Sequence, residues 1–138
     1  MAGQEKLLRL VLRILGSGGL LAIPFAFLPY SWMNAIHQGS GMGQLPKEPI
    51  VGYLARSTSA FYAMIGGLLW LMSFDVRRHR LALCYLGGAI CFLGMLLFGV
   101  DLLEGLPFWW NLVEGLGNTA FGIAILFLAC RIGRRSQQ

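Results

Sequence analysis

Charged residues are scarce in this chain of 138 residues, where Asp, Glu, Lys and Arg together make up 12%. Globular proteins usually carry about 25%. Hydrophobic residues make up 57%, more than a single soluble domain of this length can bury. The net charge of +5 lies mainly in short clusters at the ends of apolar runs, without a basic groove and interleaved aromatics, so nucleic acid is not an expected partner. The composition indicates a membrane protein.

Cysteine and histidine are also scarce, with three and two residues. Cys84, Cys91 and Cys130 form no CxxC pair and show no metal-type spacing. The first two are seven residues apart on one helix face, which excludes a disulfide between them. We interpret all three as small buried apolar side chains. The HExxH, GxSxG and Walker motifs are absent from the sequence. The sequence thus indicates no catalytic residue, no metal and no cofactor.

What the chain does contain is a set of apolar runs, each long enough for a helix to cross a hydrocarbon core of about 30 Å. Pro24 should kink the first of these helices, which we expect to stay uncleaved, and Pro107 suits the first turn of the last one. The runs predict an all-α membrane protein, a four-transmembrane-helix bundle in a single domain (1–138), with helices at about 10–33, 50–74, 81–101 and 107–130.

Glycine is abundant, at 19 residues, and its positions indicate two roles. In residues 34–50, three glycines and two prolines argue against a regular helix, so we predict an exterior loop that packs over the helix ends. Gly87 and Gly94 share one face of the third helix, and Gly115 and Gly122 lie close to one face of the fourth. Such faces favour close helix packing in lipid.

Lysine and arginine positions predict the orientation of the chain. Three lie in the N-terminal segment, three in the 75–80 turn and three in the C-terminal tail, while only Lys47 lies in the loop between the first two helices. Under the positive-inside rule, both termini and the 75–80 turn are cytoplasmic. The three groups are Lys6, Arg9 and Arg13; Arg77, Arg78 and Arg80; and Arg131, Arg134 and Arg135.

Polar side chains interrupt the apolar runs at matching depths. Asn111, Glu114 and Asn118 share one helix face at spacings of three and four. Sixteen uncharged residues separate Glu114 from Arg131, which is about 24 Å of helix. Eighteen uncharged residues follow Arg56, and this places the arginine at a similar depth. Because a charge at membrane depth needs a partner or water, we predict an ion pair between Arg56 and Glu114.

This polar group allows two functional interpretations. In the first, which we favour, the ion pair pins helix two to helix four, with Asp101 or Glu104 as rival partners for Arg56. The protein is then a non-catalytic scaffold or accessory subunit that packs through glycine-rich helix faces. In the second, an outward-facing pocket binds a lipid or quinone head group, and the ligand-binding residues are Arg56, Glu114, Asn111, Asn118 and Tyr53. The expected partners are membrane lipid and either a second copy of the chain or a larger membrane complex.

Two segments also carry a resemblance. Residues 48–64 and 74–80, which read EPIVGYLARSTSAFYAM and FDVRRHR, resemble small bacterial four-helix membrane proteins of the DoxX-like type. The resemblance covers the layout of most of the chain, but in its residues it covers the second helix and the turn after it. It implies four spans and a place in the bacterial cytoplasmic (inner) membrane, and it assigns no activity and no catalytic residue.

Overall fold

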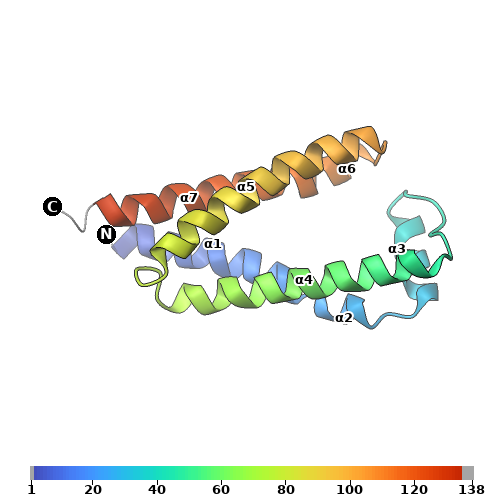
Figure 1. Cartoon of the computed structure of the whole chain (residues 1–138), viewed down its shortest axis with the longest axis horizontal. Coiled ribbons are helices and arrows are strands. Elements are labelled where there is room, and N and C mark those ends of the chain that lie inside the picture. Colours follow the sequence, from blue (N-terminus) through green and yellow to red (C-terminus); the bar gives the residue numbers. More distant parts are fainter. Residues whose placement is uncertain (1, 135–138) are drawn as a thin grey trace. The chain divides into compact units, whose positions relative to one another are not determined.

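A computed structural model describes residues 2–134, with side chains within residues 3–132, and is drawn in Figure 1. Over residues 2–134 the backbone forms helices and turns, with no strand. Arg135 of the predicted basic tail and the side chain of Arg134 lie outside the described residues. In chain order the elements are α1 (Ala2–Leu20), α2 (Ile23–Ala26), α3 (Tyr30–Gly39), α4 (Pro49–Phe74), α5 (Arg80–Leu103), α6 (Phe108–Asn111), the π-helix η1 (Leu112–Leu116) and α7 (Gly117–Arg134).

The described part of the chain contains four helical stretches that are long and apolar enough to cross a membrane. This confirms the all-α prediction and fits the predicted four-helix bundle. The chain divides into two compact units, which we call the large unit (residues 1–15 and 69–138) and the small unit (residues 16–68). The four stretches are Gly3–Ala26, Pro49–Phe74, Arg80–Leu103 and Phe108–Ile132.

The N-terminal span differs from the predicted kinked helix over 10–33. α1 begins at Ala2 and ends at Leu20, and a turn at Leu21 and Ala22 interrupts the stretch Gly3–Ala26 before α2. Pro24 lies in the first turn of α2, where its missing N–H leaves no helical hydrogen bond unmade. Pro29 stands before α3 with an extended backbone, φ −60° and ψ 151°. Because proline fixes φ and removes a donor, two prolines this close divide the span into α1, α2 and α3.

The predicted loop over 34–50 is wrong in its first part, because α3 continues to Gly39. Proline and glycine are absent between Tyr30 and Gln38, so nothing in that stretch stops the helix. The helix ends where the glycines begin. Gly41 and Gly43 both have φ of 80°, in the left-handed region that glycine occupies without steric cost.

The rest of this segment folds back onto α3 within the small unit. The Asn34 side-chain oxygen accepts the backbone N–H of Leu45 at 2.8 Å, and the Tyr30 hydroxyl donates to the carbonyl of the same residue. The His37 Nδ1 lies 3.0 Å from the carbonyl oxygen of Gly43. These bonds satisfy loop backbone groups that have no helical partner.

A glycine contact joins α1 to α4 in the small unit. A Cβ added at Gly19 would lie 2.6 Å from the carbonyl oxygen of Tyr62, and one added at Gly66 would lie 2.6 Å from the carbonyl oxygen of Gly16. The two helix backbones therefore touch at this point. Helices in lipid associate through close approach of this kind. Lipid tails are as apolar as the helices, so the hydrophobic effect does not drive the helices together.

In the large unit, α5 and α7 lie side by side along most of their length (Figure 1). Glycines again set the distance between them. A Cβ at Gly87 would lie 2.6 Å from the backbone nitrogen of Leu126, and one at Gly94 would lie 2.5 Å from that of Thr119. The predicted close packing along the face of Gly87 and Gly94 is thereby confirmed. The buried apolar side chains of this unit are Leu8, Leu12, Leu69, Met72, Val76, Leu83, Ile125, Leu128, Ala129 and Ile132.

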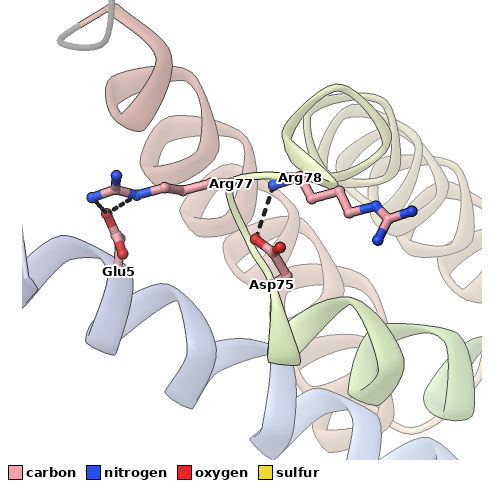
Figure 2. Close-up of polar contacts among 4 residues, drawn as sticks. All are labelled: Glu5, Asp75, Arg77 and Arg78. Carbon is pink, nitrogen blue, oxygen red and sulfur yellow. Dashed lines mark hydrogen bonds and ion pairs between the residues drawn. The ribbon is translucent and has the colours of Figure 1, made fainter.

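Charged side chains gather where α4 passes into α5. Figure 2 shows Arg77 reaching Glu5 of α1, with Nη2 2.6 Å from the carboxylate, and the backbone N–H of Arg78 donating to Asp75 at 3.1 Å. The start of α1, this turn and the end of α7, which runs antiparallel to α5, therefore share one end of the large unit. The orientation prediction requires this arrangement of the basic segments, and the side of the membrane on which they lie stays a prediction.

Candidate functional site

The candidate site lies at the other end of the large unit, where α5 passes into α6 and η1. We call Asp101, Asn111 and Glu114 the polar junction. After α5 ends, Gly105 turns the chain with φ of 69°, and Pro107 stands immediately before α6 with φ −57° and ψ 139°. Pro107 thus starts the fourth span close to where the sequence predicts its beginning, because a fixed φ near −65° is preorganised for a first helical turn.

Helix register brings two residues of the junction to the same level. A Cβ added at Gly115 would lie 2.6 Å from the Cβ of Phe98, so these two positions face each other across the interface of α5 and η1. Asp101 lies about one turn after Phe98 on α5, and Asn111 lies about one turn before Gly115 on the antiparallel partner. Both side chains are buried, with 3% of Asp101 and 2% of Asn111 exposed.

Two buried acceptor atoms of the junction lack a donor. Among the described residues, Oδ2 of Asp101 and Oδ1 of Asn111 have no hydrogen-bond partner. An unsatisfied buried polar atom costs about 1–3 kcal/mol, and more when the group is charged. Both oxygens can accept a hydrogen bond, so a donor near them would satisfy them. An arginine, a ligand hydroxyl or ammonium, or water could supply it.

The backbone of the junction departs from the α-helix. Residues 112–116 form a π-helical segment that contains Glu114, and such segments occur frequently at functional sites. The Asn118 side chain donates to the carbonyl of Glu114 at 2.7 Å, and the Thr119 hydroxyl donates to that of Gly115 at 2.8 Å. Asn118 therefore supports the π segment, and its amide hydrogen is used by the chain's own backbone.

Glu114 is the one carboxylate on this segment, and it accepts a hydrogen bond from the indole N–H of Trp110. Trp109 and Trp110 contact each other edge to face, with ring centroids 5.4 Å apart, and Trp109 is exposed. Amphipathic indoles collect at membrane interfaces. This end of the large unit therefore has the side-chain composition of an interface, with a carboxylate held just inside it.

Arg56 and Tyr53, the remaining predicted site residues, belong to the small unit. Nη2 of Arg56 donates to the carbonyl oxygen of Leu28 at 3.3 Å. This carbonyl lies in the break before Pro29, so the arginine stabilises backbone that has left the helix. Tyr53 is 66% exposed. The predicted ion pair with Glu114 would join the two units, and it stays a prediction.

The small unit contains a pocket that the sequence did not reveal. It has a volume of about 480 Å³ and is lined by Tyr30, Asn34, Gln44, Leu45, Pro46 and Lys47. Residues 44–47 of the loop fold against α3 and form a polar concavity with it, while the prediction that the loop covers helix ends stays a prediction. The polar residues at both ends of the loop were the only sequence feature that indicated this pocket. They lie close together because α3 continues to Gly39, which the sequence did not predict.

No group of three or more His, Cys, Asp or Glu side chains within the described residues is placed to hold a metal ion. Comparisons with protein-family models, curated proteins and solved structures found no match for this chain. The resemblance to DoxX-like proteins therefore stays a prediction.

Proposed function

We propose that the protein is a non-catalytic scaffold or accessory subunit of the bacterial cytoplasmic membrane, with both termini in the cytoplasm. The observation that supports this is a free face of α5. Gly88, Phe92, Met95 and Gly99 recur at spacings of four, three and four, so they share one face of the helix. It is separate from the Gly87 and Gly94 face that packs on α7.

This α5 face has the shape that a second helix requires. Phe92 and Met95 are 64% and 55% exposed. Among the described residues, a Cβ added at Gly88 or Gly99 would meet nothing within 4 Å. Large apolar side chains beside open glycines offer a ridge and a groove to a neighbouring helix, and helices in lipid associate through such close packing. The partner in this proposal is a transmembrane helix of a second copy or of a larger complex.

The polar junction supports the internal part of the proposal. Among the described residues, Oδ2 of Asp101 and Oδ1 of Asn111 have no hydrogen-bond partner, and Arg56 is a donor of similar predicted depth on another span. We infer that Arg56 pairs with Glu114, with Asp101 and Glu104 as rivals, and so pins α4 to the fourth span. A buried ion pair needs further hydrogen bonds with neighbouring polar groups, because these offset the loss of hydration of its two charges.

The scaffold proposal is tested by blocking the α5 face without disturbing the fold. Gly88→Leu fills open space on that face, and Gly52→Leu on α4 is a matched control because its Cβ would also meet nothing described within 4 Å. Native mass spectrometry of gently solubilised membranes should show a complex for the unaltered protein and for Gly52→Leu, and a monomer for Gly88→Leu. A monomeric unaltered protein, or a complex that survives Gly88→Leu, would contradict the proposal.

A second candidate function follows from the pocket of about 480 Å³ in the small unit. Lys47 and Gln44 provide an ammonium and an amide there. Tyr30 and Asn34 hydrogen-bond to the backbone of Leu45 and so fix one side of the pocket. We propose that this pocket binds the polar head group of a lipid or a quinone. A lipid or quinone should then co-purify with the protein and be lost in Lys47→Met but not in the control Lys6→Met. Absence of any such molecule from native preparations would refute this function while leaving the scaffold proposal open to its own test.

A further inference from the structure

Two cysteines that are far apart in the sequence meet in the large unit. The Sγ atoms of Cys84 on α5 and Cys130 on α7 lie 3.2 Å apart, and both thiols are free. Their separation of 46 residues carries no motif, so the sequence indicates only three isolated apolar side chains. The structure places two of those side chains in direct contact.

The contact is held in register by the glycines between the two helices. Gly87, three residues after Cys84, packs against the backbone of Leu126, four residues before Cys130. Because backbone atoms touch there, α5 and α7 cannot slide along each other without separating. The two thiols are therefore kept together one turn beyond this contact. A disulfide has an S–S length of about 2.05 Å, so closing the bond from 3.2 Å needs the two sulfur atoms to approach by about 1 Å.

The pair is also accessible. Cys130 is exposed and Cys84 is half-buried. Cys130 lines a mostly apolar groove of about 400 Å³ at the basic end of the large unit, together with Ile123, Leu126, Phe127 and Arg131. The guanidinium of Arg131 lies 4.0 Å from the centre of the Phe127 ring, so the one charged side chain of the groove packs on an aromatic ring. Hydrogen peroxide is a small uncharged molecule, and Cys130 is exposed at this groove.

Cys91 does not compete for either partner. It lies on the same face of α5 as Cys84, but it faces the backbone of α7, where a Cβ added at Gly122 would overlap the Cys91 backbone. Cys91 is therefore a matched internal control: the same residue type, on the same helix, without a facing cysteine among the described residues.

We propose that Cys84 and Cys130 form a reversible thiol–disulfide site that closes in response to a peroxide. The Cys130 thiolate attacks one oxygen of hydrogen peroxide and breaks the O–O bond. This gives a sulfenic acid and, with the thiol proton, one water. The Cys84 thiol then attacks the sulfenic sulfur, forms the S–S bond and releases a second water. Two thiols lose two electrons and two protons, and one peroxide becomes two waters.

Closure links α5 to α7 at the basic end of the large unit. A dithiol such as dithiothreitol, or a cellular dithiol of the thioredoxin type, reverses it by thiol–disulfide exchange. In a reducing cytoplasm the site rests open. Oxidation then converts a packed helix pair into a covalently joined one, without changing the contacts that already exist between the helices.

The test counts thiols in the purified protein reconstituted in lipid vesicles. After treatment with a small molar excess of hydrogen peroxide, alkylation under denaturing conditions followed by mass spectrometry should find one free thiol in place of three. Dithiothreitol should restore all three. Trypsin leaves the three cysteines in one peptide, because Lys and Arg are absent between Leu81 and Cys130. Cleavage after Glu104 separates Cys130 from the other two, and those fragments should remain joined until reduction.

The variants identify the partners. Cys91→Ser should oxidise as the unaltered protein does and end with no free thiol. Cys84→Ser should form no intramolecular link and should leave Cys130 as a sulfenic acid that a cyclic diketone probe traps. Circular dichroism of each variant checks that the helices are retained. Three free thiols after peroxide treatment of the unaltered protein, or a link that includes Cys91, would overturn the proposal.

Discussion

The contact between α5 and α7 can be tested with a pair of adjacent glycines on α5. Gly87→Ala adds a methyl group 2.6 Å from the backbone nitrogen and 2.9 Å from the Cα of Leu126, and 3.0 Å from the carbonyl oxygen of Gly122. These neighbours are backbone atoms of α7 and cannot rotate away, so the helices must separate. Gly88→Ala adds the same group at the next residue, where it meets nothing described within 4 Å.

The magnitude follows from comparing the two variants. Replacing glycine by alanine inside a helix stabilises it by about 0.5–1 kcal/mol, and this gain is common to both positions. Overpacking in a close-packed interior costs about 1–3 kcal/mol, and it applies to Gly87→Ala alone. We therefore expect Gly88→Ala to be as stable as the unaltered protein or slightly more stable, and Gly87→Ala to be about 1–3 kcal/mol less stable than Gly88→Ala.

The assay is unfolding of the purified protein in mixed micelles with increasing dodecyl sulfate, followed by tryptophan fluorescence and circular dichroism. The free energies of unfolding of the two alanine variants are compared with each other, because their hydrophobicity and helix propensity are identical. Equal stability of the two variants would refute the backbone contact at Gly87. So would a loss at Gly88→Ala that matches or exceeds the loss at Gly87→Ala.

Three further predictions concern charged groups and topology. The Arg77 side chain of the Arg77–Glu5 ion pair is 57% exposed. A double-mutant cycle with Arg77→Gln and Glu5→Gln should therefore give a coupling energy of about 0.2–1 kcal/mol, as surface ion pairs do. A much larger coupling energy would contradict the interpretation of this contact as a surface ion pair. If they break a buried pair, Arg56→Met and Glu114→Gln should each lower the free energy of unfolding by about 3–5 kcal/mol. The double variant should lose less than the sum of the two single losses. Strictly additive losses in the same unfolding assay would exclude the pairing. An alkaline phosphatase fused after Gln138 should be inactive, because that enzyme needs an oxidising exterior compartment to form its disulfides, and an active fusion would show that the C-terminus is not cytoplasmic.

Local sequence patterns predicted the parts of the fold that depend on neighbouring residues. Long uncharged runs produce membrane-length helices wherever they occur, because every backbone polar group in lipid must be satisfied within its own helix. Pro107 predicts the start of the fourth span for an equally local reason. Gly87 and Gly94 share a face in any α-helix, so a close-packing surface was predictable, although its partner on α7 was not.

The break of the first span shows where a local pattern is insufficient. Pro24 in a long apolar run is compatible with a kinked helix or with two helices. In the structure α1 ends at Leu20, before Pro24, and α2 ends at Ala26, before Pro29. The beginning of the loop was also misplaced, because residues 30–38 contain no proline or glycine that would end α3. The continuation of α3 to Gly39 then created the polar pocket against residues 44–47.

The sequence by itself determined that this chain is an all-α protein with four helices of membrane length, and it identified Asn111, Glu114 and Asp101 as polar residues at one end of their spans. The folded chain alone shows that Asp101 and Asn111 are buried, each with an oxygen that has no partner among the described residues, and that Cys84 contacts Cys130. These facts depend on the register between α5 and the fourth span. That register is set by glycine contacts between backbones, and no periodicity within a single helix encodes which glycine meets which partner.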